Sequence, residues 1–285
     1  MSVPGPTGLL VVDKPAGITS HDVVARARRA LGTRKVGHAG TLDPMATGVL
    51  VLGVGRATRL LGHLMLTEKA YDATIRLGVA TTTDDAEGEV VAEADTARLD
   101  EAAVRAVLSA YVGEIEQVPT AVSAIKVDGK RAYQRVRDGE EVELRARAVT
   151  IHELAVTRLD LPEVDVRVRC SSGTYIRAIA RDVGRDLGVG GHLTALRRTA
   201  VGPFGLDLAH DPDELGPDAL LPMAQVARAA FPVHELDDRQ AQDVRYGRPL
   251  DVRLAGLTAV LDPSGEFLAL YEPQADRARP VAVFC

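Results

Sequence analysis

The sequence has few of the residues that hold small secreted domains or metal sites together. It contains no tryptophan, six tyrosines, four phenylalanines and only two cysteines, Cys170 and Cys285. The two distant cysteines cannot build a disulfide framework and form no CxxC pair, and the seven histidines show no HxxxH or HExxH spacing. These absences exclude a disulfide-stapled domain, disfavour a structural zinc site and fit a reducing, cytoplasmic compartment.

Long apolar segments are also missing. No apolar run approaches the length of about 18 residues that a spanning helix needs, and the run Gly8–Val12 is too short for a signal peptide. At 285 residues, with 46% hydrophobic and 26% charged residues, the chain has the composition of a globular protein of about two domains with an aliphatic core. The formal net charge of −6 disfavours indiscriminate binding of nucleic acid, whose partners are usually basic.

Strand-like and helix-like segments are mixed without a regular β-α-β order, which predicts an α+β fold. Ser20 is the expected N-cap of a helix that Gly32 ends. A stretch rich in Asp, Pro and Gly between Ala209 and Pro232 indicates a boundary, which gives domains 1–228 and 229–285, the second built of short strands. The other expected elements are strands at 9–12, 49–54, 71–79 and 163–170, helices at 56–66, 99–111, 175–187 and 219–230, a polar loop at 81–88 and a hairpin at 127–130.

Cofactor motifs are weak or missing. Gly53-x-Gly55-x-x-Thr58 is close to a dinucleotide fingerprint, but its third glycine is replaced and no acidic residue follows about 20 residues later in a β-α-β unit. There is no GxxxxGK[ST] phosphate loop. Cofactor-free chemistry and plain binding are the classes that remain.

Chemistry-bearing residues are densest around Asp43. An aspartate between Leu42 and Pro44 in a glycine-flanked loop is, taken alone, usually a turn or helix-cap carboxylate. The stretch Gly37-His-Ala-Gly-Thr-Leu-Asp-Pro-Met-Ala-Thr-Gly48, however, resembles the catalytic-loop signature of the tRNA pseudouridine synthases of the TruB type. Four further blocks match that family in order over about residues 8–205: Leu10–Ser20, Lys69–Tyr71, Ser123–Lys130, and Cys170–Arg177 continuing to His192–Arg198.

The resemblance implies a fold and a reaction. The fold is a pseudouridine synthase catalytic domain with a mixed, largely antiparallel sheet, followed by a small β-rich, PUA-like RNA-binding domain. The reaction isomerises the uridine at position 55 in the T-arm loop of tRNA: the glycosidic bond to N1 is broken, and the uracil is turned and rejoined through C5. No cofactor and no metal are needed. The base must leave its stack, at a cost of a few kcal/mol.

The resemblance also assigns roles to six residues. Asp43 matches the family's catalytic carboxylate, and Arg177 matches the arginine that orients it and favours its ionised form. Tyr71 matches the tyrosine that stacks on the uracil and acts in proton transfer, a contact worth about 1–3 kcal/mol. The remaining matches are Tyr175 and Leu196, which line the uridine pocket, and His38, which contacts the RNA where the base has left.

A second reading is an RNA-binding or folding protein that has the scaffold without turnover. The presence of Asp43, Tyr71 and Arg177 together favours the enzyme, because a binding module needs none of them. One position departs from the family pattern: between Pro119 and Ser123 the chain has Thr-Ala-Val, where many relatives carry an aromatic residue. The catalytic assignments do not depend on it.

The net charge is a sum over unlike segments. Residues 14–59 carry +6 and residues 165–198 carry +4, and both contain the motifs, whereas residues 84–101 carry −7 and residues 207–218 carry −5. An RNA backbone requires positive charge locally, not in total. We therefore expect a basic groove beside Asp43, an acidic far side, and a monomer that binds the T-arm stem-loop of tRNA.

Overall fold

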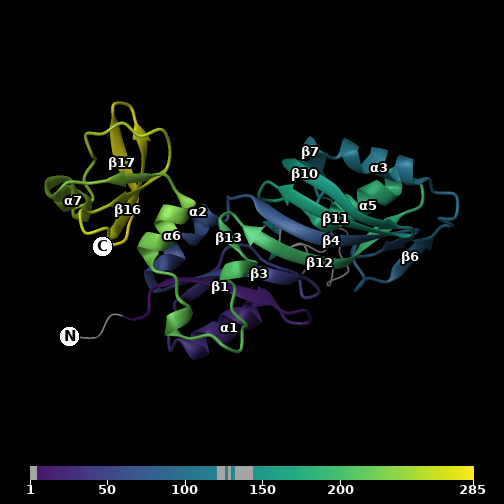
Figure 1. Cartoon of the computed structure of the whole chain (residues 1–285), viewed down its shortest axis with the longest axis horizontal. Helices are drawn as coiled ribbons and strands as arrows, with labels where there is room; N and C mark the ends of the chain where they lie inside the picture. The colour runs from purple at the N-terminus through teal and green to yellow at the C-terminus, as the bar shows by residue number, and fades with distance from the viewer. Residues whose placement is uncertain (1–4, 121–125, 128–129, 132–143) are drawn as a thin grey trace.

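The chain folds around one large and one small β-sheet (Figure 1). The computed structural model describes residues 5–120, 126–127, 130–131 and 144–285. The strands are β1 (Gly8–Lys14), β2 (Val36–His38), β3 (Thr47–Val54), β4 (Lys69–Leu77), β5 (Val79–Thr81), β6 (Val90–Glu93), β7 (Gly113–Gln117), β8 (Lys126–Val127), β9 (Lys130–Arg131), β10 (Arg147–Asp160), β11 (Glu163–Cys170), β12 (Gly191–Val201), β13 (Phe204–Gly205), β14 (Val233–Glu235), β15 (Thr258–Leu261), β16 (Phe267–Gln274) and β17 (Arg277–Val283).

The helices flank these sheets rather than alternate with their strands. Three of them, α1, α3 and α5, contribute side chains to the core under the large sheet, and α6 lies where that sheet meets the small one (Figure 1). The helices and 3₁₀ turns are α1 (Ser20–Ala30), η1 (Gly55–Arg59), α2 (Leu61–Leu64), α3 (Glu101–Ala110), α5 (Ile176–Asp186), η2 (Leu206–Leu208), η3 (Pro217–Ala219), α6 (Met223–Ala230) and α7 (Asp238–Arg245).

The large sheet confirms the prediction of a mixed, largely antiparallel α+β fold. Its strand order is β1-β3-β12-β4-β11-β10-β7, with β2 beside β3 and β13 beside β12. The pair β3–β12 is parallel, and the other pairs among its described strands are antiparallel. The small sheet has the order β14-β15-β16-β17 and forms the predicted C-terminal β-rich part.

Strands β1 and β3 are buried on both faces, because alternate side chains point into two different cores. Leu10 and Leu50 pack with α1, α3 and α5 in one core. Leu9 and Val49 pack with α6, β15 and β16 in the other. Double burial explains why these strands are continuous apolar runs, whereas Glu163–Cys170, with one face in the core, alternates as predicted.

The small sheet is attached to the large one through the second of these cores. Phe284, which is 3% exposed, packs there, accepts a hydrogen bond on its carbonyl from Arg56 Nη1 at 2.5 Å, and has the Arg59 guanidinium 5.1 Å from its ring centre. Val226 and Ala227 of α6 are buried in the same core. Since α6 spans the predicted boundary at 228/229, the two parts share apolar contacts across it.

Two local predictions are corrected, and one helix was not predicted. Thr19, not Ser20, caps α1: Thr19 Oγ1 accepts from Asp22 N at 3.1 Å, and the Asp22 carboxylate accepts from Thr19 N at 2.8 Å. The single helix expected at 56–66 is a 3₁₀ turn followed by a four-residue helix. Helix α7 was not predicted, although its capping box, an Asp followed three residues later by Gln, is a sequence-level signal.

The hairpin expected at 127–130 is present as the antiparallel pair β8–β9, with Val127 opposite Lys130. Its turn lies outside the described residues. The same holds for Ser123 and the residues just before it, where the chain departs from the family pattern.

Helix α5 packs unusually close to the sheet. A Cβ added to Gly184 would lie 2.2 Å from the backbone of Gly190 and Gly191, so a side chain there would force the helix outward. This close approach holds α5, which carries Arg177, near the sheet strands that form the rest of the site.

Candidate active site

Buried polar side chains hold the loop between β2 and β3 on both sides of Asp43. Ser20 Oγ accepts a hydrogen bond from Leu42 N at 2.9 Å and donates one to Leu42 O at 3.0 Å. Lys14 Nζ donates to Pro44 O at 3.2 Å. Since Ser20 and Lys14 are 1% and 0% exposed, a displaced loop would leave buried polar groups without partners, which is costly.

The Lys14 ammonium group is held by three backbone carbonyls, one of them in this loop. Its Nζ also donates to Pro15 O at 2.9 Å and to Ile18 O at 2.8 Å. Burial lowers the pKa of Lys14 to about 8, and the nearby charge of Asp43 opposes the decrease. The positive charge counted for Lys14 in the sequence is therefore not a surface charge.

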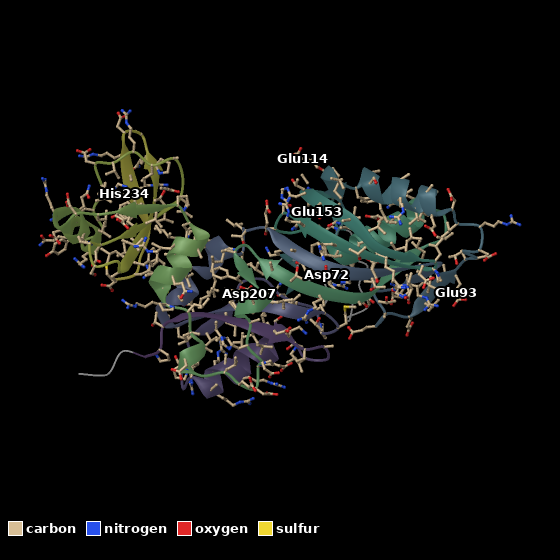
Figure 2. The ribbon with its side chains drawn as sticks, viewed as in Figure 1. Asp72, Glu93, Glu114, Glu153, Asp207 and His234 are labelled. Carbon is tan, nitrogen blue, oxygen red and sulfur yellow. The ribbon has the colours of Figure 1, made fainter. Side chains whose placement is uncertain are left out.

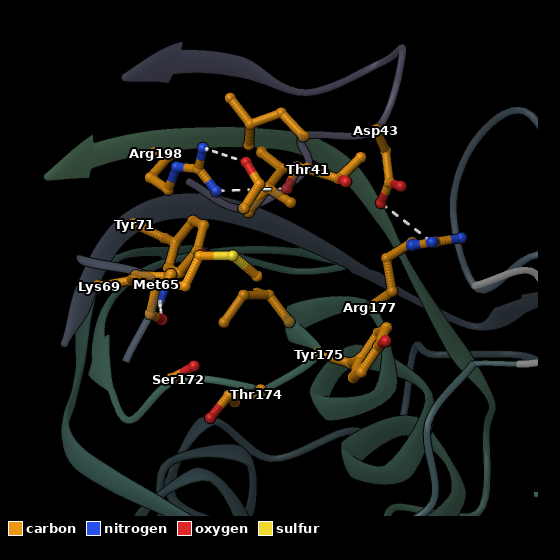
Figure 3. A pocket seen from close by; sticks show the side chains of 15 residues that line it. Thr41, Asp43, Met65, Lys69, Tyr71, Ser172, Thr174, Tyr175, Arg177 and Arg198 are labelled. Atoms are coloured by element: carbon orange, nitrogen blue, oxygen red, sulfur yellow. Dashed lines mark hydrogen bonds and ion pairs between the residues drawn. The ribbon is translucent and has the colours of Figure 1, made fainter. Parts of the chain in front are cut away.

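Asp43 and Arg177 form an ion pair at one end of a pocket. Arg177 Nη2 lies 2.9 Å from Asp43 Oδ2 (Figure 3). The Arg177 side chain is 5% exposed and that of Asp43 is 38% exposed, so the carboxylate faces open space while the guanidinium does not. Arg177 Nη1 also donates to Asp85 Oδ2 at 3.0 Å and to Thr83 O at 2.9 Å. A planar guanidinium held on its other side presents a fixed edge to Asp43.

Asp85 completes this network and was missed at the sequence level. It is 3% exposed, and its Oδ1 accepts from Thr83 Oγ1 at 2.5 Å and from Glu87 N at 3.1 Å. The sequence indicated only a polar loop at 81–88, where an aspartate usually faces solvent. Its partner Arg177 is 92 residues away, and no local pattern signals a contact of that range.

Asp84 is buried as well. Its Oδ2 lies 3.1 Å from Arg181 Nη1, and burial raises the pKa of Asp84 while Arg181 opposes the rise. Asp84 and Asp85 thus lie beside Arg177, which corrects the expectation that the acidic segment 84–101 forms only a far side. Glu93, later in that segment, is exposed on the β5–β6 hairpin at the end of the molecule away from the small sheet (Figure 2).

Tyr71 and Arg198 are paired residues of β4 and β12 at the other end of the pocket (Figure 3). Tyr71 is 6% exposed, and burial raises the pKa of its hydroxyl, an effect that Arg198 opposes. Arg198, 1% exposed, donates from Nε to Val49 O at 2.7 Å, from Nη1 to Thr41 O at 3.3 Å and from Nη2 to Gly40 O at 3.2 Å. Arg198 therefore ties the Asp43 loop to the sheet through carbonyl groups.

Gly48 permits the crossing of this loop over β12. Its φ is +98°, and a Cβ there would lie 2.2 Å from Arg198 O, so only glycine fits. Lys69 is the second buried cation at this end, with Nζ donating to Met65 O at 2.9 Å and Thr67 O at 3.0 Å. Burial, reinforced by the charge of Arg198, lowers the pKa of Lys69 to about 8.

The two ends enclose a cavity of about 280 Å³. Pockets that hold small ligands begin at about 300 Å³, so this cavity suits a group the size of one nucleoside rather than a large ligand. Five of the six residues singled out from the sequence line it. The lining residues are Gly40, Thr41, Leu42, Asp43, Met65, Lys69, Tyr71, Ser172, Gly173, Thr174, Tyr175, Ile176, Arg177, Leu196 and Arg198.

His38 is the sequence-selected residue that does not line this cavity. It ends β2 just before the Asp43 loop, and its ring meets His21 edge-on with ring centres 5.6 Å apart. It therefore lies beside the loop and not in the pocket.

The two basic segments differ in how their charges are used. In residues 165–198, Arg177 and Arg198 are buried, and most of the others are paired with acidic side chains, so this segment supplies less free positive charge than expected. In residues 14–59, a set that we call the basic cluster is exposed, and no described acidic side chain lies within ion-pair distance of it. The basic cluster consists of Arg28, Arg29, Arg34, Lys35, Arg56 and Arg59.

Two further observations concern the described residues only. Among them, no three or more His, Cys, Asp or Glu side chains are grouped as metal ligands. None of their helices is long and apolar enough to cross a membrane.

Solved structures with the same architecture come from complexes that contain Cbf5. The chain superposes on a chain of the crystal structure of a Cbf5-Nop10-Gar1 complex with a TM-score of 0.75 and 26% identity, covering 98% of this chain and 85% of that one. A chain of the archaeal box H/ACA sRNP Nop10-Cbf5 complex gives a TM-score of 0.72 at 25% identity, covering 98% and 86%. The fold is that of the pseudouridine synthases, and it brings the loop carboxylate, its arginine and the buried tyrosine into one pocket.

Sequence comparisons specify the family. Residues 28–176 match the N-terminal domain of the TruB family of pseudouridylate synthases, and residues 231–285 match the C-terminal domain described as tRNA pseudouridine synthase II. The tRNA pseudouridine synthase B of Thermobifida fusca is 57% identical over 97% of this chain and 98% of its own, and that of Nocardia farcinica is 59% identical over 97% and 92%. The chain belongs to the TruB family.

Proposed function

We propose that this chain converts the uridine at position 55 in the T-arm loop of tRNA to pseudouridine. The tRNA substrate is supported by the relatives named tRNA pseudouridine synthase B, which match this chain almost end to end. The position is supported by the match of residues 37–48 to the signature of the TruB type. The observation that carries the proposal is the ion pair of Asp43 and Arg177 at 2.9 Å in a pocket shared with Tyr71.

The reaction keeps every atom of the substrate. The bond from the ribose C1′ to N1 breaks, the uracil turns in the pocket, C5 bonds to C1′, and the proton on C5 is lost while N1 gains one. Attack of Asp43 on the base, attack on the sugar and an elimination route all require an ionised carboxylate. Arg177, fixed by Asp85 and Thr83 on its far side, pairs with the Asp43 carboxylate and holds it in place.

The remaining lining groups receive the flipped base. Extrusion of a base costs a few kcal/mol, and stacking on an aromatic ring returns about 1–3 kcal/mol. We assign the stacking to Tyr71. Burial raises the pKa of its hydroxyl, so the phenol is protonated before the reaction begins and takes part in proton transfer during it. Tyr175 and Leu196 supply the other apolar walls. His38, beside the loop, contacts the RNA where the base has left.

We further propose that the enzyme works as a monomer in the cytoplasm, without metal or cofactor. The isomerisation transfers no electrons, and protonated and ionised side chains suffice for its proton steps.

The basic cluster is the surface that we assign to the RNA backbone. Residues at the end of α1 and the start of β2 adjoin η1, because Gly55 N donates to Lys35 O at 2.8 Å. Each phosphate contact gives a salt dependence of affinity. We expect the affinity for a T-arm stem-loop to fall as salt rises, and to fall less steeply for the double variant Arg34→Gln/Lys35→Gln. An affinity that ignores salt would contradict this assignment.

The function is tested with the unmodified chain and an unmodified tRNA transcript. The transcript is incubated with the protein without added metal or nucleotide, and pseudouridine is then located along the sequence by a chemical probe. One modified position, 55, converted in full, supports the proposal. Tight binding without product would instead identify an RNA-binding protein, and modification elsewhere would disprove the site.

A further inference from the structure

The start of the helix that carries Arg177 is held by a residue distant in sequence. Helices α1, α3 and α7 are each capped by the side chain of their own N-cap residue. The N-cap of α5 is Tyr175, whose side chain makes no such bond. Instead Gln117, at the end of β7 and 58 residues away, binds the Tyr175 backbone.

The contact is a two-point clamp by one carboxamide. Gln117 Oε1 accepts from Tyr175 N at 2.8 Å, and Gln117 Nε2 donates to Tyr175 O at 3.0 Å. Gln117 is 2% exposed. Two hydrogen bonds to the N–H and C=O of one residue fix both its position and the orientation of its peptide groups.

Tyr175 connects this clamp to the site in two ways. The Tyr175 side chain lines the cavity, and Arg177 follows two residues later in the first turn of α5 (Figure 3). An error of about 1 Å in the placement of a catalytic group can cost about 100-fold in rate. The position of Gln117 therefore affects how the Tyr175 ring lies against the base and how the Arg177 guanidinium lies against Asp43.

The residues after Gln117 are bound to the same region. Arg181 Nη2 donates to Val118 O at 2.7 Å. Thr120, which is 0% exposed, donates from Oγ1 to Thr83 O at 3.3 Å, the carbonyl that also accepts from Arg177. The end of β7 is therefore fixed to α5 and to the Thr83–Asp85 turn, and gives Gln117 a rigid base.

We propose that Gln117 is a positioning residue of the pseudouridine synthase site, whose carboxamide sets Tyr175 and the first turn of α5 for the chemical step. The inference rests on the proposed function for its substrate. Gln117 touches neither the base nor Asp43, and it acts through Tyr175 and Arg177.

The variant Gln117→Glu tests this, because it keeps the shape and makes the donor depend on pH. A neutral carboxyl group can both donate to Tyr175 O and accept from Tyr175 N, whereas a carboxylate only accepts. Burial raises the pKa of a glutamate in such a place, and the nearby Arg181 and Arg177 oppose the rise while Asp84 and Asp85 add to it. The donor is present at low pH and lost at high pH.

The measured quantity is the single-turnover rate on a T-arm stem-loop, as the ratio of variant to wild type at each pH. We expect this ratio to be within about threefold of one near pH 5.5 and to fall by at least about tenfold near pH 8.5, with the stem-loop Kd unchanged within about threefold. Glu116→Gln, a change at the exposed neighbour in the same strand, is the control and should give a flat ratio near one.

Gln117→Met keeps the volume without either hydrogen bond, and its ratio should be low at every pH. Ratios near one at every pH for both Gln117→Glu and Gln117→Met would overturn the proposal, as would losses in both variants that follow the fraction of unfolded protein measured by circular dichroism under the same conditions. An inactive wild type would refute the proposed function instead, so the two failures are distinguishable.

Discussion

The two ends of the pocket are each built around a buried arginine, yet their partners differ. Arg177, 4% exposed, binds two carboxylates, those of Asp43 and Asp85. Arg198, 1% exposed, binds three backbone carbonyls in the Asp43 loop and β3. Arg177, between two carboxylates, fixes the position of a charged group, whereas Arg198, among carbonyls, fixes the position of the backbone. One end of the pocket thus holds the carboxylate that we propose as the reacting group, and the other holds the loop that carries it.

Among the residues that surround Asp43, Arg177→Lys is expected to have the largest effect on the rate. An ammonium cannot span Asp43, Asp85 and Thr83 as the guanidinium does, so the carboxylate loses its fixed partner. We expect the single-turnover rate to fall by about 100-fold with stem-loop affinity changed by less than about threefold. Arg167→Lys, in an exposed pair with Asp72, is the matched control.

Arg198→Lys tests the other side of the comparison. The lysine cannot reach all three carbonyls, and a buried acceptor left without a donor costs about 1–3 kcal/mol. We expect urea unfolding to show a loss of about 2 kcal/mol, and the rate to fall by only about tenfold through the displaced loop. If Arg198→Lys cost no more stability than Arg177→Lys, the difference between the two ends would not hold.

Lys69→Met gives a smaller effect, visible as a pH dependence of stability. The pKa of Lys69 falls from 10.5 to about 8 on burial, so between these values the unfolded chain binds more protons than the folded one. Stability due to this group therefore rises with pH from about 8 to about 10.5, and below about 8 the cost of the buried ammonium is complete. Relative to the variant, the wild type should gain about 1–3 kcal/mol over that window. Urea unfolding of both proteins at pH 7.5 and pH 9.5 measures the gain, which a constant difference would disprove.

The features that could be predicted from the sequence are those that local pattern determines. The alternation over Glu163–Cys170 reproduces the bounds of β11, because a strand with one face buried and one exposed repeats every two residues. The α+β class followed from the order of such segments. Five of the six site residues were brought into one cavity, but their selection came from the family resemblance and not from their local surroundings.

The features that could not be predicted depend on contacts between distant residues. Asp85 lies in a polar stretch and is buried only because Arg177 meets it. Ser20 has the residue type of an N-cap, but the cap is Thr19, and the Ser20 hydroxyl serves the loop of Asp43 through Leu42. The arginines of residues 165–198 were counted as free positive charges, whereas in the folded chain most of them pair with acidic side chains. Such pairing appears only when the strand order is known.

If the Asp43 carboxylate carries the reaction, a variant without its charge should still bind RNA and should form no product. Asp43→Asn keeps the size of the side chain while it removes the charge. Single-turnover conversion and equilibrium binding of an unmodified T-arm stem-loop are measured on this variant and on wild type. We expect no detectable pseudouridine from Asp43→Asn and an affinity within about tenfold, or about 1.4 kcal/mol, of wild type. Normal turnover by Asp43→Asn would contradict this expectation.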